Sequence, residues 1–342
     1  MLWGVSVGTS TEIRLAARKA LAATGGWGAS IGGWVAWIAV EFCVNHLLGG
    51  LAAPLAVGGG SGLTMLALSA VATVAVFYYF TFVKVYGLSA LAVSVMRGAP
   101  AFRYAFSGFG RGWHSVGVHL WIGWCLFVPA LPWLLPLLGF CAWTCAVPER
   151  SAAAVRAAAA YLDAQPYMVC ACAAVVVGVL LTPTIAAWYR YRLAYMVLID
   201  HPDRACRAIV DESARLMEGR RSTMFRLDLW FIGVTALLYL PGCVSILRGI
   251  RGLDAVAMQN MANCMLKGNV EDAVQTLQSI DPGALGLVLG GAFMVSVAGF
   301  VLTLWLNPYW TAARAAFYET VLDLVEGQTP PPLREDGQLE VP

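Results

Sequence analysis

Four polar side chains in two long apolar runs have the residue types and spacing that chemistry inside a membrane requires. Glu41 is the acid that lies well inside the first run, and Asn45 follows four residues later on the same helical face, with His46 next to it. These three side chains can line a small polar pocket. If the second run crosses the membrane near residues 72–95, Lys84 lies deep and needs an acidic partner, for which Glu41 is the candidate. Glu41, Asn45, His46 and Lys84 form the predicted intramembrane polar site.

Two interpretations of Glu41 remain open. A charge at the centre of a membrane helix costs at least ~2.5 kcal/mol, so an ionisable residue there suggests a role in handling protons or solutes. A single glutamate can instead stay protonated and donate a hydrogen bond to a neighbouring helix, which is a structural role.

The remaining reactive residue types form no recognised catalytic or metal-binding set. Among nine cysteines, Cys141 and Cys145 share a helical face, and Cys170 and Cys172 begin the next apolar run. Neither a Cys-x-x-Cys pair nor a helpful histidine spacing accompanies them, and cysteine is a common small apolar residue in packed helices. Zinc-protease and phosphate-loop motifs are missing as well. We therefore predict no enzyme, no metal and no cofactor.

Composition indicates which elements must position these residues. The 342-residue chain is 59% hydrophobic and 12% charged, far less charged than the roughly 25% of soluble domains. Six apolar runs are long enough to cross a hydrocarbon core about 30 Å thick as helices. They cover residues 27–48, 63–83, 116–147, 166–200, 227–247 and 284–306. Because backbone amides in lipid must bond within their own segment, we expect an all-α polytopic membrane helix bundle. Residues 1–326 form one domain, and the proline-rich tail 327–342 is predicted to be disordered.

Basic residues set the expected orientation. With both termini in the cytoplasm, seventeen of the 22 Lys and Arg residues fall on the inner side. The net charge of only +2 and the correspondence between basic residues and topology give no support for nucleic-acid binding.

Two amphipathic helices are predicted at the cytoplasmic surface. The first covers residues 10–24, where Thr9 and Glu12 have the spacing of a capping box. The second covers residues 201–221, with Asp200 as its N-cap. It packs on the bundle as a connector, or it offers a surface for a protein partner or anionic lipid. The residues of that predicted surface are Arg204, Arg207, Ile209, Arg215, Met217, Arg220 and Arg221.

Glycines predict where helices approach or bend. The pairs Gly28 and Gly32, and Gly286 and Gly290, have the spacing of close helix contacts in membranes. The second apolar run continues to Arg97, too long for one upright crossing, so it bends near Gly87 or projects into the cytoplasm.

Prolines and interface residues give further expectations. Pro183 and Pro308 each precede an aromatic stretch and an arginine, a spacing that fits three related kinked hairpins but also arises by chance. Residues 189–195 read as an aromatic and basic belt at headgroup level. Asp228 and Arg226, at the start of the fifth run, are expected to cap the helix or to snorkel.

Three segments carry a resemblance to a known family: "TEIRLAARKAL", the block from "RLAYMVLIDHPDRACR" through "STMFRLDLWFIG", and "NPYWTAARAAFYETVL". They resemble a bacterial integral-membrane family known only as domain of unknown function nine hundred and seventy-five. The match is most specific over residues 195–233, and residues 141–165 depart from it. The resemblance implies a six-helix protein of the bacterial cytoplasmic membrane and implies no activity.

Two functions follow as expectations. The first is a non-catalytic accessory or scaffold protein whose partners are the lipid bilayer and a protein at the cytoplasmic face. The alternative is a transporter or exporter component that uses Glu41 and kinked helices.

Overall fold

The computed structural model describes residues 9–23, 25–56, 62–146, 166–252 and 281–327, and every regular element within these ranges is helical. In chain order the elements are α1 (Ser10–Ala22), α2 (Gly26–Ala56), α3 (Gly62–Met96), η1 (Phe102–Arg111), α4 (Gly112–Ala146), α6 (Pro166–Arg190), α7 (Ala194–Asp200), α8 (Cys206–Leu216), α9 (Arg221–Gly252), α12 (Pro282–Val301), η2 (Leu302–Leu306) and α13 (Asn307–Glu326). Apart from Gly327, the predicted disordered tail lies outside the described residues.

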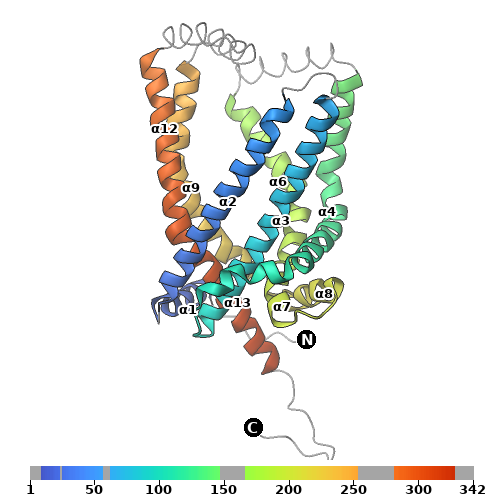
Figure 1. The fold of residues 1–342 in the computed structure, drawn as a ribbon, viewed down its shortest axis with the longest axis vertical. Coiled ribbons are helices and arrows are strands. Elements are labelled where there is room, and N and C mark those ends of the chain that lie inside the picture. The colour runs from blue at the N-terminus through green and yellow to red at the C-terminus, as the bar shows by residue number, and fades with distance from the viewer. Residues whose placement is uncertain (1–8, 24, 57–61, 147–165, 253–280, 328–342) are drawn as a thin grey trace, which may run out of the picture.

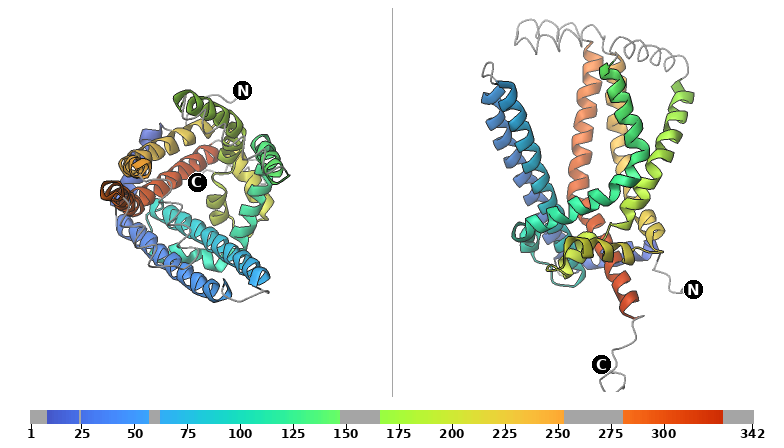
Figure 2. Two further views of the ribbon diagram at one scale, coloured as in Figure 1. Left: turned by 90° about the horizontal axis from the view of Figure 1, so that it is seen from above. Right: turned by 90° about the vertical axis from the view of Figure 1, so that its right-hand side faces the viewer.

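The long helices form three hairpins. Helix α2 packs against α3, α4 against α6, and α9 against α12 (Figure 1). The hairpins meet at one end of the molecule, which we call the base and which is formed by α1, η1, α7, α8 and α13 (Figure 1). Figure 2 shows that they diverge toward the opposite end. Both ends of the described chain lie at the base (Figure 1).

Within the described residues, five helical segments are long and apolar enough to cross a membrane, which confirms the predicted membrane helix bundle. They are Gly26–Leu47, Val71–Met96, Phe102–Trp143, Arg221–Ile250 and Pro282–Val325. Helix α6, with 25 residues, lies against α4 and completes the second hairpin.

The predicted fourth span, residues 166–200, is wrong in its last ten residues. Helix α6 ends at Arg190, and the separate helix α7 follows after a turn. The apolar residues of α7, Met196, Val197 and Leu198, are buried inside the base. Hydropathy continues across the break because the protein core, like lipid, selects apolar side chains.

Helix α1 matches its prediction closely. Thr9 caps the helix, and the side chain of Glu12 accepts a hydrogen bond from the Thr9 backbone N–H at 2.6 Å, which completes the capping box. The apolar face, Ile13, Ala17 and Leu21, is buried against the rest of the base. The helix therefore packs on protein through that face.

Helix α8 is shorter than the predicted helix 201–221. It begins at Cys206, and its N-cap is Ala205, which makes no side-chain capping bond. Asp200 was predicted as the N-cap, but it is the last residue of α7. An aspartate ahead of Pro202 resembles a helix start in sequence, yet this carboxylate is taken up by a long-range ion pair with Arg97.

Helix α3 is continuous from Gly62 to Met96, so the predicted break near Gly87 is wrong, and the projection into the cytoplasm stays a prediction. Thirty-five residues span about 50 Å, more than the hydrocarbon thickness. Its last turns are buried in the base. A side chain at Gly87 would collide with the backbone carbonyl of Ala105 in η1, so this glycine permits close packing of η1 rather than a kink.

The predicted glycine contacts are wrong in position. Nothing lies within 4 Å of a side chain built at Gly28, Gly286 or Gly290, and one at Gly32 would meet only the Phe102 ring of η1, at 3.4 Å. The close helix contact lies instead between α9 and α12, where a Cβ at Gly291 would lie 2.7 Å from the carbonyl oxygen of Gly242. Small residues are needed there because the two backbones approach directly.

Prolines and a π-helical turn interrupt the long helices. Pro183 lies inside α6, and the neighbouring Thr184 donates a hydrogen bond to the carbonyl of Pro129 in α4 at 2.9 Å. Pro308 follows the π-helical turn η2. The π-helical turn lies between α12 and α13, where the third hairpin meets the base.

The glycine contact predicts a matched pair of substitutions. Gly291→Ala inserts a methyl group against backbone and is expected to cost about 1–3 kcal/mol of stability. Gly290→Ala meets open space and is expected to be neutral or stabilising by up to about 1 kcal/mol. Thermal unfolding in detergent compares the two. Equal melting temperatures would contradict the close contact.

Candidate functional site

A buried carboxylate lies at the centre of the base. Asp228, on α9, is only 1% exposed. Tyr189 Oη and Trp310 Nε1 donate hydrogen bonds to it at 3.1 and 2.6 Å. Arg314 Nε lies 3.1 Å from Oδ1, and Arg192 Nη2 lies 3.4 Å from Oδ2. We call these five residues the Asp228 cluster.

The Asp228 cluster joins elements that are distant in sequence. Tyr189 ends α6, Arg192 lies in the turn before α7, and Trp310 and Arg314 lie one helical turn apart on α13. The Arg314 guanidinium carbon lies 4.2 Å from the centre of the Trp310 ring, a cation–π distance. The second hairpin is thereby fixed to the third hairpin and to α13.

The charges of the Asp228 cluster do not cancel. Two guanidinium groups share one carboxylate, and their side chains are only 18% and 19% exposed. Three donors, from Tyr189, Trp310 and Arg314, already bond to the carboxylate, and the Arg192 guanidinium pairs with it at 3.4 Å. Arg192 Nε is buried without a hydrogen-bond partner. One positive charge and at least one N–H donor are left over.

A cavity of about 220 Å³ adjoins this surplus charge. Arg192 and Arg314 both line it, together with His119 from α4 and Tyr195 from α7. His119 Nδ1 lies 3.0 Å from Tyr195 Oη. Hydrogen-bond donors beside an enclosed space can bind an anion, which is the chemistry that this arrangement supports.

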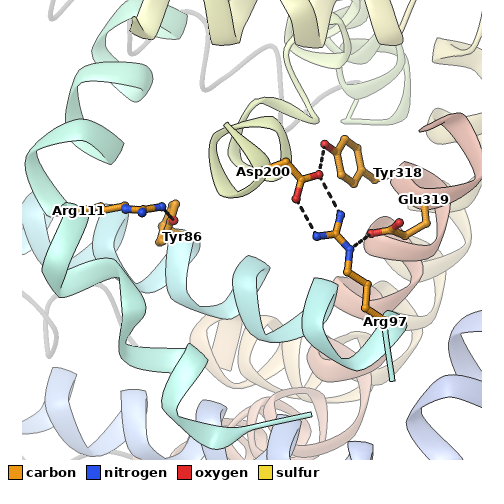
Figure 3. A network of polar contacts seen from close by, with 6 residues as sticks. All are labelled: Tyr86, Arg97, Arg111, Asp200, Tyr318 and Glu319. Carbon is orange, nitrogen blue, oxygen red and sulfur yellow. Dashed lines mark hydrogen bonds and ion pairs between the residues drawn. The ribbon is translucent and has the colours of Figure 1, made fainter. Parts of the chain in front are cut away.

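A second polar network fastens α3 to the base (Figure 3). Arg97 donates two hydrogen bonds to Asp200, at 2.8 and 2.9 Å, and its Nε lies 2.9 Å from Glu319 on α13. Tyr318 Oη donates to the same Asp200 carboxylate at 2.7 Å. This bidentate geometry ties the end of α3 to the end of α7 and to α13.

The pKa values of Arg97 and Asp200 are shifted in the directions that keep both groups of this second network charged. The hydrogen bond to Asp200 raises the pKa of Arg97 above its ordinary value. Burial by itself would raise the pKa of Asp200, but the hydrogen bonds from Arg97 and Tyr318 outweigh it and lower that pKa below its ordinary value. The stabilisation is present above the pKa of an unfolded aspartate, near 4, and is lost as the pH falls through the lower folded-state pKa.

The predicted intramembrane site is brought together in part. Lys84 Nζ lies 2.8 Å from Glu41 Oε1, so the structure pairs the two residues expected to be partners. Asn45 and His46 lie further along α2 with exposed side chains, and the histidine ring bonds to the carbonyl of Phe42 on its own helix. Neither Glu41 nor Lys84 lines the cavity beside the Asp228 cluster.

The predicted α8 surface divides into two groups. Ile209 and Met217 are fully buried, so they belong to the core and not to a docking surface. Periodicity identifies an apolar face but not whether protein or membrane covers it. The arginines differ among themselves: Arg204, Arg207 and Arg215 are exposed. Arg220 and Arg221 are half-buried.

Sequence reasoning missed the Asp228 cluster. Asp228 was expected to cap or snorkel, and the arginine and tyrosines of residues 189–195 were expected to lie in a headgroup belt. A weak signal was present, because Tyr189 is followed by Arg192 and Trp310 by Arg314, each about one helical turn later. An aromatic residue with an arginine on the next turn is typical of a membrane interface, and only the fold brings both pairs to one carboxylate.

Metal binding finds no support in the ranges that the structure describes, where His, Cys, Asp and Glu form no group of three that could hold an ion. The expectation that the chain needs no cofactor stays a prediction.

The Asp228 cluster predicts a large effect from a small change. Asp228→Asn removes the negative charge and leaves two arginines buried together, which is expected to cost about 3–5 kcal/mol. Asp211→Asn is the matched control, since Asp211 is 68% exposed and its pair with Arg207 is worth at most about 1 kcal/mol. Both variants are heated in detergent and the folded fraction is followed by size-exclusion chromatography. Similar melting curves would show that the Asp228 carboxylate is not the charge partner described here.

Comparison with known proteins gives one match. Residues 8–324 match the family described as "Protein of unknown function (DUF975)", so the match covers all three hairpins and the base. No curated protein and no solved structure matches the chain. The chain therefore belongs to the DUF975 family of unknown function.

Proposed function

We propose that the chain is a non-catalytic accessory protein of the bacterial cytoplasmic membrane that holds a protein partner at its cytoplasmic face. The observation that carries the proposal is that α8 packs on the bundle through its apolar face and exposes its charged face. Its apolar residues Ile209 and Met217 are fully buried, while Arg207 and Arg215 on the opposite face have side chains 76% and 68% exposed. A helix fixed by its apolar face presents its charged face in a constant position.

The arginines of α8 have weak partners of their own. Arg207 lies 3.7 Å from Asp211 and Arg215 lies 2.6 Å from Glu212, both within the same helix. Exposed pairs of this kind contribute about 0.2–1 kcal/mol, so acidic groups of a partner can replace them at little cost. Guanidinium groups bind carboxylates in bidentate geometry, which favours an acidic protein surface as the partner.

The use of charge inside the bundle supports an accessory role over transport. The transport alternative requires Glu41 to face a shared interior cavity. Glu41 instead pairs with Lys84 across the first hairpin, and the residues that line the cavity beside the Asp228 cluster do not include either of them. Charges that tie one helix to the next serve the bundle's architecture.

The proposed orientation places the base in the cytoplasm. In a cysteine-free background, Arg207→Cys on α8 and Asp281→Cys at the start of α12 are treated with a membrane-impermeant maleimide. We expect Asp281→Cys to react in intact spheroplasts and Arg207→Cys to react only after permeabilisation, because basic residues favour the inner side. The reverse pattern would contradict the proposed location of the partner.

Photocrosslinking tests the partner itself. A photoreactive amino acid at the exposed position Ala208 is expected to give a discrete adduct with one protein in native membranes. The double variant Arg207→Glu and Arg215→Glu should abolish that adduct through charge repulsion, while Arg103→Glu, an exposed arginine elsewhere on the base, should leave it intact. An adduct that survives the double variant, or the recovery of lipid alone, would overturn the proposal.

A further inference from the structure

Two cavities beside α3 share a wall. The inner one is the 220 Å³ cavity at the Asp228 cluster, and the outer one is a groove of about 710 Å³ between α3 and α4. Phe82 and His119 line both spaces. Their rings stack with centroids 4.0 Å apart, so these two residues form the boundary at which the groove and the cavity meet.

The groove is apolar and aromatic. Tyr78, Tyr79, Phe80 and Trp113 line it, and the Trp113 side chain is 80% exposed. It lies within two segments that are apolar enough to cross a membrane, so its mouth opens where lipid acyl chains are available. An apolar groove of this volume suits a hydrocarbon chain better than a polar solute.

The inner cavity, unlike the apolar groove, is positively charged along one wall. Arg192 and Arg314 line it, whereas no Asp or Glu is among its lining residues. Asp228 offsets only one of the two charges, and the buried Arg192 Nε has no partner. An anionic group in the cavity would offset the positive charge that Asp228 leaves uncompensated.

The rest of the cavity wall argues against a small free anion. Phe82, Val85, Ile122 and Trp188 line the same space as the two arginines. A hydrated inorganic anion would gain nothing from these side chains, because apolar walls give no hydrogen bonds to replace its hydration shell. A molecule with a charged head and an apolar body can satisfy both parts of the lining.

We propose that the inner cavity binds the anionic head of a single-chain amphiphile, a carboxylate or a phosphate monoester, and that its hydrocarbon chain lies in the groove between α3 and α4. Arg192 and Arg314 hold the head group with charge-assisted hydrogen bonds. Phe82 and His119 lie where the head passes into the chain. The site is independent of α8 and of any partner bound there.

Isothermal titration of the full chain in uncharged detergent micelles tests the site. The probes are dodecanoate, methyl dodecanoate and inorganic phosphate. We expect one dodecanoate per chain, with the ester and phosphate each at least tenfold weaker, because the ester lacks the charge and phosphate lacks the chain. If phosphate binds as tightly as dodecanoate, the cavity binds a free anion and the amphiphile proposal is wrong. If dodecanoate and its methyl ester bind equally, the arginines do not recognise the charged head.

Two variants and a control test whether dodecanoate binds in the inner cavity. Arg192→Gln leaves one arginine on Asp228, so the cluster becomes neutral, and we expect dodecanoate to bind at least tenfold more weakly. Ser89→Trp fills the cavity without changing its charge and should weaken dodecanoate binding to a similar extent. Because Ser89 is not part of the Asp228 cluster, this loss would come from the blocked cavity and not from a disrupted cluster. Arg190→Gln, an exposed arginine outside the lining, should bind like the wild type. Equal losses in Arg190→Gln and Arg192→Gln, or unchanged binding in Ser89→Trp, would overturn the proposal.

Discussion

The Asp228 carboxylate, buried and shared by two arginines, is the constraint on which the arrangement of the second and third hairpins around α13 depends. Arg192 and Arg314 come from the α6–α7 turn and from α13, and neither charge can remain in the base without an acid. A buried ion pair adds little net stability compared with apolar residues of the same shape, but removal of one partner is costly. The cluster therefore acts by fixing position, since one arrangement of α6, α9 and α13 satisfies its charges.

Beyond the base, apolar packing holds the two helices of a hairpin together. Helices α9 and α12 approach at Gly242 and Gly291 so closely that a side chain at either glycine would collide with backbone. Between hairpins the situation differs, because only 6% to 28% of the most apolar window of each membrane segment is buried within the chain. The hairpins are thus closely packed units that an apolar core and polar contacts join at the base, and lipid or other proteins must cover their diverging faces.

Local features of the sequence predicted the helices of the fold well, but the Asp228 cluster depends on pairs of residues that are far apart in the sequence. The membrane segments, the α1 capping box and the buried face of α8 depend on residues within a few turns of one another, so pattern alone reveals them. Asp200 and Asp228 were misassigned as caps, because an aspartate near a helix start more often caps that helix than pairs with an arginine far away in the sequence. Their partners Arg97 and Arg314 lie 103 and 86 residues away, a pairing that no local pattern encodes. Glu41 and Lys84 were matched because both are isolated charges in apolar runs.

Distances between spin labels test most directly whether the Asp228 cluster holds the hairpins together. Pulsed electron paramagnetic resonance on a cysteine-free chain compares labels across the base, at Arg18 and Arg207, with labels near the opposite end, at Leu47 and Leu289. The account predicts a narrow distance distribution across the base that broadens in Asp228→Asn, and a broad distribution at the opposite end in both proteins. A base distribution that stays equally narrow in a folded Asp228→Asn variant would contradict it.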